Sequence, residues 1–374
     1  MTTRPPPTRE ERVAVLSSGA RTAVGRGAPA SAAAVRAGIG HFTEHPFVVD
    51  RRGRRLRVAR ATWLPIDVHG RARFIRLAAT AAKEALAFTP ALRARIEATK
   101  PSARAKVHVF VGLPEARAGR PEGLDDFVAR ALESVVALRD PVGSTVTLAE
   151  GHAASLMAIE QAAALIRSGD ADLCLAGGVD SWLEPAALGA LDTERRIFGP
   201  NRPWGFTPGE AAGFCVLASS RWSARHGMTP SVSLAGAGSS REPAPMGSRQ
   251  VCIGRGLGNA FEGALSCLES GAEGVTHLVG DLNGEPYRAD ELGFARSRFA
   301  DRFATSSAPI VPASSWGDVG AASGALFTGL VLDRALRGVA RDTHSLVWAS
   351  SDGGRRAAAL FRSHALDPNP GSDS

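Results

Sequence analysis

Short apolar runs rich in β-branched residues alternate along the chain with Ala- and Leu-rich segments of roughly ten to sixteen residues. This alternation is typical of an α/β protein, in which helices cover the faces of a central sheet. Glycine and proline cluster between the segments and mark turns. The pattern predicts strands over 13–16, 107–111, 173–176, 214–217, 232–235, 277–279 and 346–349. It predicts helices over 31–37, 73–87, 124–139, 153–167, 259–269, 289–299 and 321–336.

Two of the predicted helices resemble each other in sequence. AASLMAIEQAAALI begins at Ala153, and AASGALFTGLVLDRAL begins at Ala321. Both open with small residues, which allow another backbone or a ligand to approach the first helical turn closely. A glycine and a polar residue precede each of them, with His152 in the first case and Asp318 in the second. Chance similarity between Ala-rich helices remains an alternative to internal duplication, which would predict two similar halves packed together.

The composition is that of an ordinary folded chain. The 374 residues are 44% apolar and 22% charged, which excludes a disordered or fibrous protein. No apolar run approaches the length of about eighteen residues that a membrane-spanning helix needs. The first residues are polar and rich in proline where a secretory signal would be apolar, so we expect a cytoplasmic protein. We also expect disordered tails over 1–12 and 367–374.

The four cysteines occur singly, without the CxxC spacing that binds zinc or exchanges disulfides. We therefore expect small buried apolar residues in a reducing compartment, and no metal ion or other cofactor. The cysteines are Cys174, Cys215, Cys252 and Cys267.

The net charge is +7, and the densest basic stretch is RRGRRLRVAR, over 51–60. Such a stretch can attract nucleic acid or an acidic protein, or it can simply be a solvated hairpin or loop. No aromatic residues interleave with the arginines to stack on bases, so nucleic acid binding is the least favoured of these interpretations.

Several segments resemble motifs of β-ketoacyl synthases, in the same order along the chain. VTLAEGHAASLMAIEQAAALIRSGDADLCLAGGVDSWLEPAAL, from Val146, resembles the segment that holds the family's nucleophile, its helix and the following LAGG strand and turn. GARTAVG near Gly19 resembles the opening strand and loop, and VHVFVGLPE at Val107 resembles the central strand. The remaining matches are RPWGFTPGEAAGFCVLAS at Arg202, SSWGDVGAASG at Ser314, and WASSDGGRRAA at Trp348, which resembles the glycine-rich closing loop.

The resemblance implies a thiolase-like α/β fold with five layers, αβαβα, built from two halves related by a pseudo-twofold axis. It places the halves at 13–223 and 228–366. The family consists of acyltransferases of fatty acid or polyketide biosynthesis. A homodimer, or a heterodimer with a ketosynthase-like subunit, is therefore the expected assembly, and an acyl carrier protein is a further candidate partner.

The residues at the family's catalytic positions are different in this chain. Aligning the family's TACASSL with EGHAASL puts His152 on the position of the nucleophilic cysteine. Asp318 and Asn283 stand on the positions of the two catalytic histidines, with Asp281 or Glu285 as alternatives to Asn283 within about two residues. The resemblance further assigns the oxyanion or closing loop to Gly353 and Gly354, and the pocket to Ser155, Trp316 and Trp348.

These replacements leave two hypotheses. An ionised carboxylate at Asp318 would repel the enolate that forms on decarboxylation, which argues against condensation. The chain would then be a degenerate, non-condensing member, acting as a partner subunit in the way chain-length factors pair with active synthases, or binding an acyl or carrier ligand. In the alternative, Asp318 orients His152 as general base in an acyltransferase or thioester hydrolase, with the Gly353 amide in the oxyanion hole.

Overall fold

The structure is a computed structural model that describes residues 12–100, 104–200, 202–268, 274–304, 307–340 and 342–364. Apart from Arg12, the tails predicted over 1–12 and 367–374 lie outside the described residues. The first half holds strands β1 (Val13–Arg21), β2 (Thr43–Val49), β3 (Arg55–Val58), β4 (Val107–Gly112), β5 (Val142–Leu148), β6 (Leu173–Ser181) and β7 (Glu210–Ser219). Its helices are α1 (Ala28–Arg36), α2 (Gly70–Ala85), α3 (Pro90–Ala98), α4 (Leu124–Ala137), α5 (Ala154–Arg167), α6 (Pro185–Thr193) and α7 (Ser220–Arg225).

The second half begins at β8 (Val232–Arg241) and ends with β12 (Arg355–Ser363). Between them lie strands β9 (Val275–Gly280), β10 (Pro309–Ile310) and β11 (His344–Ser350), and helices α8 (Arg255–Leu265), α9 (Pro286–Arg298), α10 (Ala313–Trp316) and α11 (Ser323–Leu336). The predicted division between 223 and 228 falls around the end of α7 and stays a prediction.

Every strand and helix predicted from the apolar pattern is present among the described residues, with ends shifted by a few positions; Glu269, the predicted end of one helix, lies outside them. The pattern missed the strands β2, β3, β5, β10 and β12 and the short helices α3, α6, α7 and α10. Strand β5 was missed because its sequence, VGSTVTL, mixes apolar with polar residues, and none of them is fully buried. The basic stretch 51–60 forms the turn and second strand of the β2–β3 hairpin, as one of its interpretations predicted.

The two halves repeat one strand order. Ten described strands follow the order β10-β9-β11-β12-β8-β1-β7-β6-β4-β5. The first half therefore reads β5-β4-β6-β7-β1 and the second β10-β9-β11-β12-β8. When the strands of the large sheet are counted along the chain within each half, both halves have the spatial order third, second, fourth, fifth, first. The parallel and antiparallel pairings also correspond, because β4 is parallel to β5 and β6 as β9 is to β10 and β11. In the described part of the sheet, the strands of the two halves pair where β1 meets β8, at Val13–Leu234 and Ala14–Ser233.

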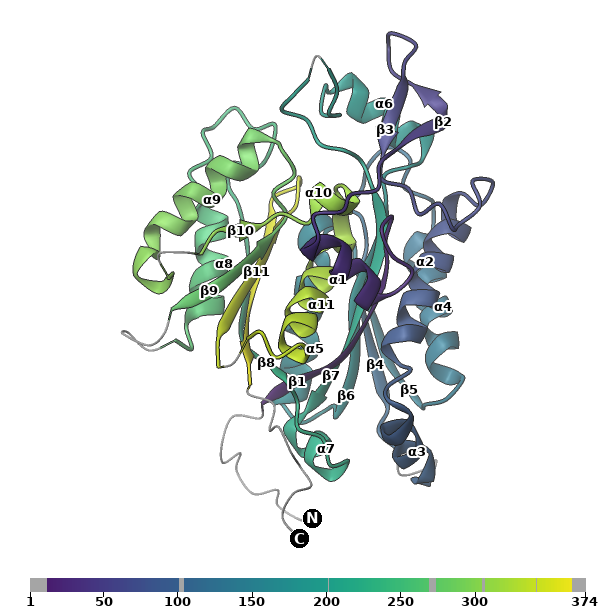
Figure 1. Ribbon diagram of the computed structural model, residues 1–374, viewed down its shortest axis with the longest axis vertical. Coiled ribbons are helices and arrows are strands. Elements are labelled where there is room, and N and C mark those ends of the chain that lie inside the picture. The colour runs from purple at the N-terminus through teal and green to yellow at the C-terminus, as the bar shows by residue number, and fades with distance from the viewer. Residues whose placement is uncertain are drawn as a thin grey trace.

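Five layers result from this arrangement (Figure 1). Helices α2 and α4 cover the outer face of the first half, and α8 and α9 cover the outer face of the second. Helices α5 and α11 lie between the two halves of the sheet and contact strands of both. The α/β five-layered architecture and the paired halves are those that the sequence resemblance implies.

The two central helices have the same entry. A 3₁₀ turn, Gly151–Ala153, precedes α5, and a second one, Gly320–Ala322, precedes α11. Each turn opens on a glycine with positive φ, 67° at Gly151 and 49° at Gly320, a backbone conformation that favours glycine. Both helices then run for 14 residues. The two similar helices predicted from the sequence therefore have equivalent structures. The structural equivalence pairs Ala154 with Ser323, one residue away from the sequence match of Ala153 with Ala321.

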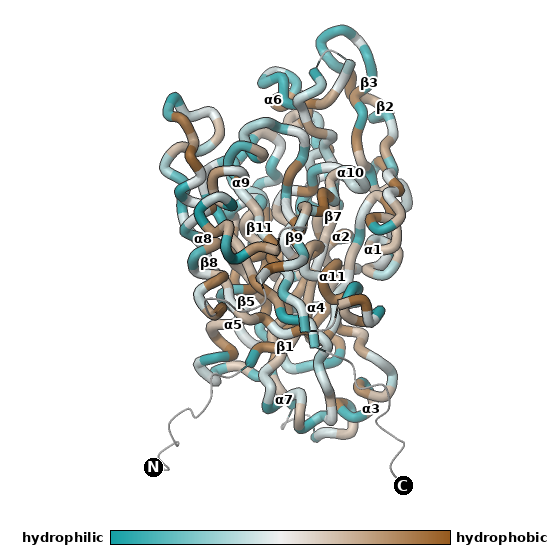
Figure 2. The backbone as a smooth tube through the Cα atoms, turned by 60° about the vertical axis from the view of Figure 1, so that its left-hand side comes forward, coloured by the Kyte–Doolittle hydropathy of each residue, from teal (hydrophilic) through white to brown (hydrophobic). Residues whose placement is uncertain are grey.

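Hydrophobic segments gather along the strands and helices in the middle of the molecule, and the tip of the β2–β3 hairpin is hydrophilic (Figure 2). Within the described residues, no helix combines the length and the apolar character needed to cross a membrane. Cys174 and Cys215 are buried as expected, but Cys252 is half-buried and Cys267 is exposed. The expectation of burial is wrong for Cys267 because α8 ends at Leu265 and leaves this residue beyond the packed helix.

Candidate functional site

The candidate site lies between the two halves, where the two central helices begin. His152 sits in the 3₁₀ turn before α5, and Asp318 lies two residues before the equivalent turn of α11. Asn283 follows the carboxyl end of β9, and Asp352 follows that of β11. The carboxyl ends of parallel strands are the usual place for polar site residues in α/β folds, because the loops there converge.

His152 and Asp318 form a buried pair. The Nε2 atom of His152 lies 2.8 Å from Oδ1 of Asp318, and the two residues are 2% and 5% exposed. Asn283 donates from Nδ2 to the other carboxylate oxygen, Oδ2, at 2.7 Å. Trp182 donates from Nε1 to Oδ1 at 3.2 Å, and the Gly320 amide donates to the same oxygen at 3.0 Å. The structure therefore brings together the three residues that the sequence placed at the family's catalytic positions.

The hydrogen bonds determine which nitrogen of His152 carries a proton. A carboxylate can only accept, so the short contact to Asp318 requires a proton on Nε2. Burial would lower the pKa of His152, but the Asp318 charge and hydrogen bond outweigh burial and the opposing Arg288 charge, so that the pKa is raised. Burial would likewise raise the pKa of Asp318, yet His152 and Arg288 hold it well below its usual range. The raised pKa of His152 and the lowered pKa of Asp318 both favour an imidazolium facing a carboxylate.

A buried arginine closes the site beside the pair. Arg288, in α9, is 3% exposed, and its Nη2 lies 3.3 Å from Nε2 of His152. Its Nη1 donates to Asp281 Oδ2 at 2.6 Å and to the Ser350 carbonyl at 2.5 Å. Nη2 also donates to Asp352 Oδ1 at 3.2 Å. Two cationic side chains can lie this close only because carboxylates flank both of them.

A second arginine, Arg196, shares Asp352 with Arg288 and extends the network of ion pairs to Glu285. Arg196 donates to both carboxylate oxygens of Glu285, at 2.7 and 3.0 Å, and to Oδ2 of Asp352 at 2.7 Å. Burial would raise the pKa of Asp352, but Arg288 and Arg196 lower it to about 2. Four carboxylates therefore face two guanidinium groups, and the excess negative charge favours a protonated His152.

A small cavity lies beside Asp318. The cavity bordered by Asn283, Trp316 and Asp318 has a volume of about 10 Å³. That is roughly the volume that a single water molecule occupies. An acyl chain has no room there in this conformation.

The two glycines assigned to the oxyanion or closing loop lie in the turn between β11 and β12. The Gly353 amide donates to both carboxylate oxygens of Glu115 at 3.1 Å, and the Gly354 amide donates to the Ser351 carbonyl at 3.1 Å. The loop does reach the nucleophile position, since Ser351 Oγ accepts from the Ala153 amide at 2.9 Å. Both loop amides are already engaged by groups of the protein itself.

The three pocket residues have different places. Trp316 is buried and borders the small cavity beside Asp318. Ser155 does not border that cavity; its Oγ accepts from the Ala325 amide and thus joins α5 to α11. Trp348 is a correction to the sequence analysis, because its ring packs edge-on against Phe261 of α8, with the ring centroids 6.0 Å apart. Its side chain therefore lies on the outer face of the second half, because successive side chains of a strand point to opposite faces.

One group of potential metal ligands occurs among the described residues, formed by Glu242, Cys252 and Glu291. Arg356 donates to Glu291 at 2.6 Å, and the Gly256 amide donates to Glu242 at 2.6 Å. Because a guanidinium and an amide already occupy these carboxylates, the group does not fit a cation.

Sequence reasoning missed Arg288, Arg196 and Asp352 as members of the site. Asp281 and Glu285 had been considered only as alternatives to Asn283, and both lie in the network. Asp352 could have been found from its position next to Gly353 in the closing loop. The arginines gave no signal, because 41 of the 44 basic residues are arginine and nothing in the pattern marks the buried ones.

Comparison with known families gives one match. The family model described as beta-ketoacyl synthase, N-terminal domain, matches residues 66–221, which include β4 to β7 and His152. Among curated protein sequences, none matches the chain.

Solved structures share the fold over nearly the whole chain at low sequence identity. A chain of the AntDE:AntF complex, described as a type II PKS acyl-carrier protein with its ketosynthase bound to the hexaketide, has 17% identity and a TM-score of 0.75, covering 96% of this chain and 100% of that one. The ishigamide ketosynthase/chain length factor has 18% identity and a TM-score of 0.72, covering 96% and 100%. The ketosynthase from module 6 of the bacillaene synthase from Bacillus subtilis 168 has 13% identity and a TM-score of 0.73, covering 95% and 72%. The fold is therefore the thiolase-like fold of ketosynthases.

Proposed function

We propose that this chain is a ketosynthase-like protein that does not condense acyl groups and acts as the partner subunit of an active ketosynthase. The observation that carries the proposal is the ion pair of His152 and Asp318, with Arg288 beside it, at the position where condensation needs a thiolate. A protonated imidazole has no lone pair on Nε2 with which to attack a thioester. The Asp318 charge would also repel a developing enolate.

The two buried cysteines offer no substitute nucleophile. Cys174 and Cys215 are buried in the sheet, and burial raises the pKa of each thiol to about 12. A thiol with such a pKa holds almost no thiolate near neutral pH.

The alternative function is an acyltransferase or thioester hydrolase with His152 as general base. The 2.8 Å contact between His152 and Asp318 is the geometry that this function needs. Three features weigh against it: the raised pKa of His152, the cavity of about 10 Å³, and the engagement of the Gly353 amide by Glu115. Binding of an acyl ligand at this site meets the same lack of space.

The partner role is supported by the free edge of the sheet. Strand β5 ends the strand order and is half-exposed along most of its length, and an exposed edge can pair with a strand of another chain. The described ketosynthase/chain length factor and the complex with an acyl-carrier protein share the fold. A reducing cytoplasm and biosynthesis of fatty acids or polyketides remain part of the proposal.

Mass spectrometry tests the loss of condensation. The purified chain is incubated with an acyl thioester of coenzyme A, beside a ketosynthase that has a cysteine nucleophile as the positive control. We expect no acyl adduct on any cysteine and no hydrolysis above the rate without protein. Stoichiometric acylation of a cysteine would refute the proposal and the assignment of His152 to the nucleophile position. Hydrolysis that disappears in His152→Ala would refute the proposal and support the alternative.

A further inference from the structure

The arginine-rich hairpin forms one wall of a wide groove. The groove lies between the β2–β3 hairpin and the segment that follows α6, both at the top of Figure 1. Its volume is about 770 Å³, within the range of roughly 300 to 1,000 Å³ typical of small-molecule sites. It shares no lining residue with the cavity at Asp318. The groove is therefore a separate candidate site.

Seven arginines line this groove, but only three carboxylates do. Arg54 donates to Asp50 from two nitrogens, at 3.0 and 2.8 Å. Arg202 binds Asp192 at 2.7 Å, and Arg51 lies 3.8 Å from the same carboxylate. Within the described part of the chain, the other four lining arginines have no carboxylate oxygen within 4.0 Å: Arg52, Arg55, Arg57 and Arg195.

The fold positions two of these arginines without neutralising them. Along β3, Leu56 and Val58 are buried under the hairpin, so Arg55 and Arg57 point to the opposite, exposed face. The Arg57 guanidinium lies 4.4 Å from the centre of the Phe42 ring and 5.8 Å from that of Phe198. Stacking on aromatic rings fixes the plane of the guanidinium and leaves its N–H groups available to an anion.

The chemistry of the groove indicates what would occupy it. The planar fork of arginine matches the oxygens of phosphate, and several unneutralised guanidinium groups in one groove require more than one negative group. Phe198 is 39% exposed on the wall and offers a face for an aromatic ring. We propose that this groove binds an oligophosphate that carries an aromatic base, the class of nucleoside di- and triphosphates. This proposal goes beyond the proposed function and rests on other residues.

A small ligand fits these observations better than a macromolecule does. A groove for single-stranded nucleic acid needs successive aromatic platforms for successive bases. Among the residues that line this groove, Phe198 is the only aromatic one. The concave shape also suits a compact ligand, whereas most protein interfaces are broad and flatter.

Isothermal titration calorimetry with ADP tests the proposal on the full chain. We expect a dissociation constant in the micromolar range that weakens as salt is raised, because the contacts are between charges. Adenosine, which has no phosphate, should bind at least about 100-fold more weakly, the loss of two charge-assisted contacts. Tripolyphosphate that binds as tightly as ADP would overturn the role of the aromatic base.

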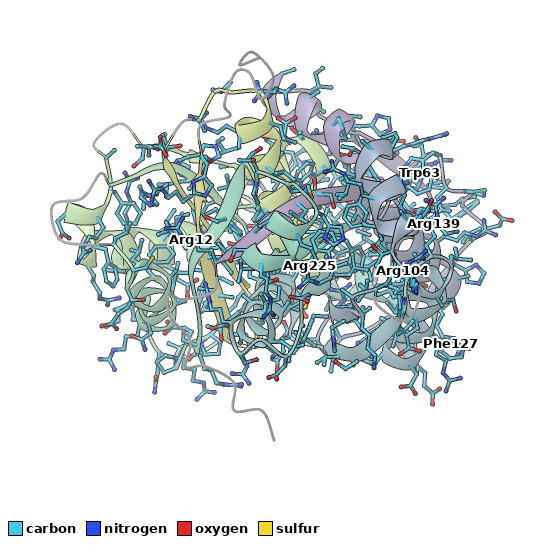
Figure 3. All side chains as sticks on the ribbon, turned by 90° about the horizontal axis from the view of Figure 1, so that it is seen from below. Arg12, Trp63, Arg104, Phe127, Arg139 and Arg225 are labelled. Carbon is cyan, nitrogen blue, oxygen red and sulfur yellow. The ribbon has the colours of Figure 1, made fainter. Side chains whose placement is uncertain are left out.

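Matched variants distinguish ADP binding in the groove from a general attraction of ADP to the positive charge of the chain. Replacing Arg55→Gln together with Arg57→Gln should weaken ADP binding by at least about tenfold. The control replaces Arg130→Gln and Arg139→Gln, two exposed arginines in or just after α4; Arg139 is labelled in Figure 3. It removes the same charge outside the groove and should change binding less than about twofold.

Three results would overturn the proposal. The first is equal weakening by the two double variants, with both folded as judged by thermal melting. The second is no ADP binding while a single-stranded oligonucleotide binds, and the third is no ADP binding while poly-glutamate binds. The acylation experiment on His152 is independent of all three, so either proposal can fail without the other.

Discussion

Removing the buried arginine of the candidate site should destabilise the fold far more than removing an exposed one. Arg288 lies between Asp281 and Asp352, at 2.6 and 3.2 Å, and is 3% exposed. The variant Arg288→Met retains most of the side-chain volume but leaves these carboxylates facing one another without their shared cation. Breaking a buried ion pair in this way costs about 3 to 5 kcal/mol.

An exposed pair provides the matched control. Arg337 donates to Asp333 at 2.9 Å, and its side chain is 38% exposed. The variant Arg337→Met removes one positive charge at an exposed carboxylate that Arg36 also binds, at 2.6 Å, and exposed pairs contribute only about 0 to 1 kcal/mol. The difference between the two variants therefore compares a buried charge network with an exposed one.

The assay is urea unfolding followed by tryptophan fluorescence, with the free energy of unfolding extrapolated to water. Should Arg288→Met fail to fold, Arg288→Lys provides a second test, because lysine retains the charge without the planar fork of arginine. We expect Arg288→Lys to fold but to be less stable than Arg337→Met. A loss below about 1 kcal/mol for Arg288→Met would show that the carboxylates protonate or rearrange at little cost. The interpretation of the site as a charge network would then be wrong.

Two further predictions concern the pair and the sheet edge. His152 has a raised pKa in the folded state, so its ion pair with Asp318 stabilises fully below the unfolded pKa of about 6.5 and is lost as pH rises through the folded pKa. The free energy of unfolding lost in His152→Ala should therefore be greatest near pH 6, about 3 kcal/mol, and decrease toward pH 9; a loss that grows with pH contradicts the ion pair. If the chain pairs through β5, sedimentation should show a dimer at micromolar concentration, and Thr147→Arg should give monomers because a twofold interface would bring two added charges together. The control Ser297→Arg, on the exposed face of α9, should remain dimeric, and a wild type that is monomeric with no partner subunit would contradict the prediction.

The layers of the fold could be predicted because buried strands and amphipathic helices leave a regular apolar pattern. The paired helices at Ala153 and Ala321 even indicated the duplication, although the structural repeat is shifted by one residue. The edge strand β5 and the hairpin strands β2 and β3 were not predicted, because strands that are exposed on one side or at an edge need no apolar run.

The central trio of the site was predicted from the order of motifs, and the surrounding charges were not. The alignment placed His152 and Asp318 next to glycine-rich turns, and left Asp281 and Glu285 as alternatives to Asn283. Arg288 escaped prediction because its helix, α9, reads as a polar surface helix, and only the three-dimensional structure shows that the face carrying Arg288 points inward. Whether an arginine is buried depends on whether buried carboxylates pair with it, and the local sequence pattern does not show this pairing.

The pocket assignment for Trp348 did not take into account the face of the sheet to which its side chain points. Along β11, alternate side chains face opposite layers, so Trp348 lies against α8 while the chain continues to Asp352 at the strand's carboxyl end. The motif match gave the position of this loop in the sequence, but not the face of the sheet to which Trp348 points. The site holds charges that neutralise one another, with Trp182 and Trp316 packed beside Asp318, so both electrostatics and packing leave little room next to this carboxylate. A single replacement such as His152→Cys would place a thiol beside Asp318, whose negative charge disfavours the thiolate, so condensation requires the whole network to change.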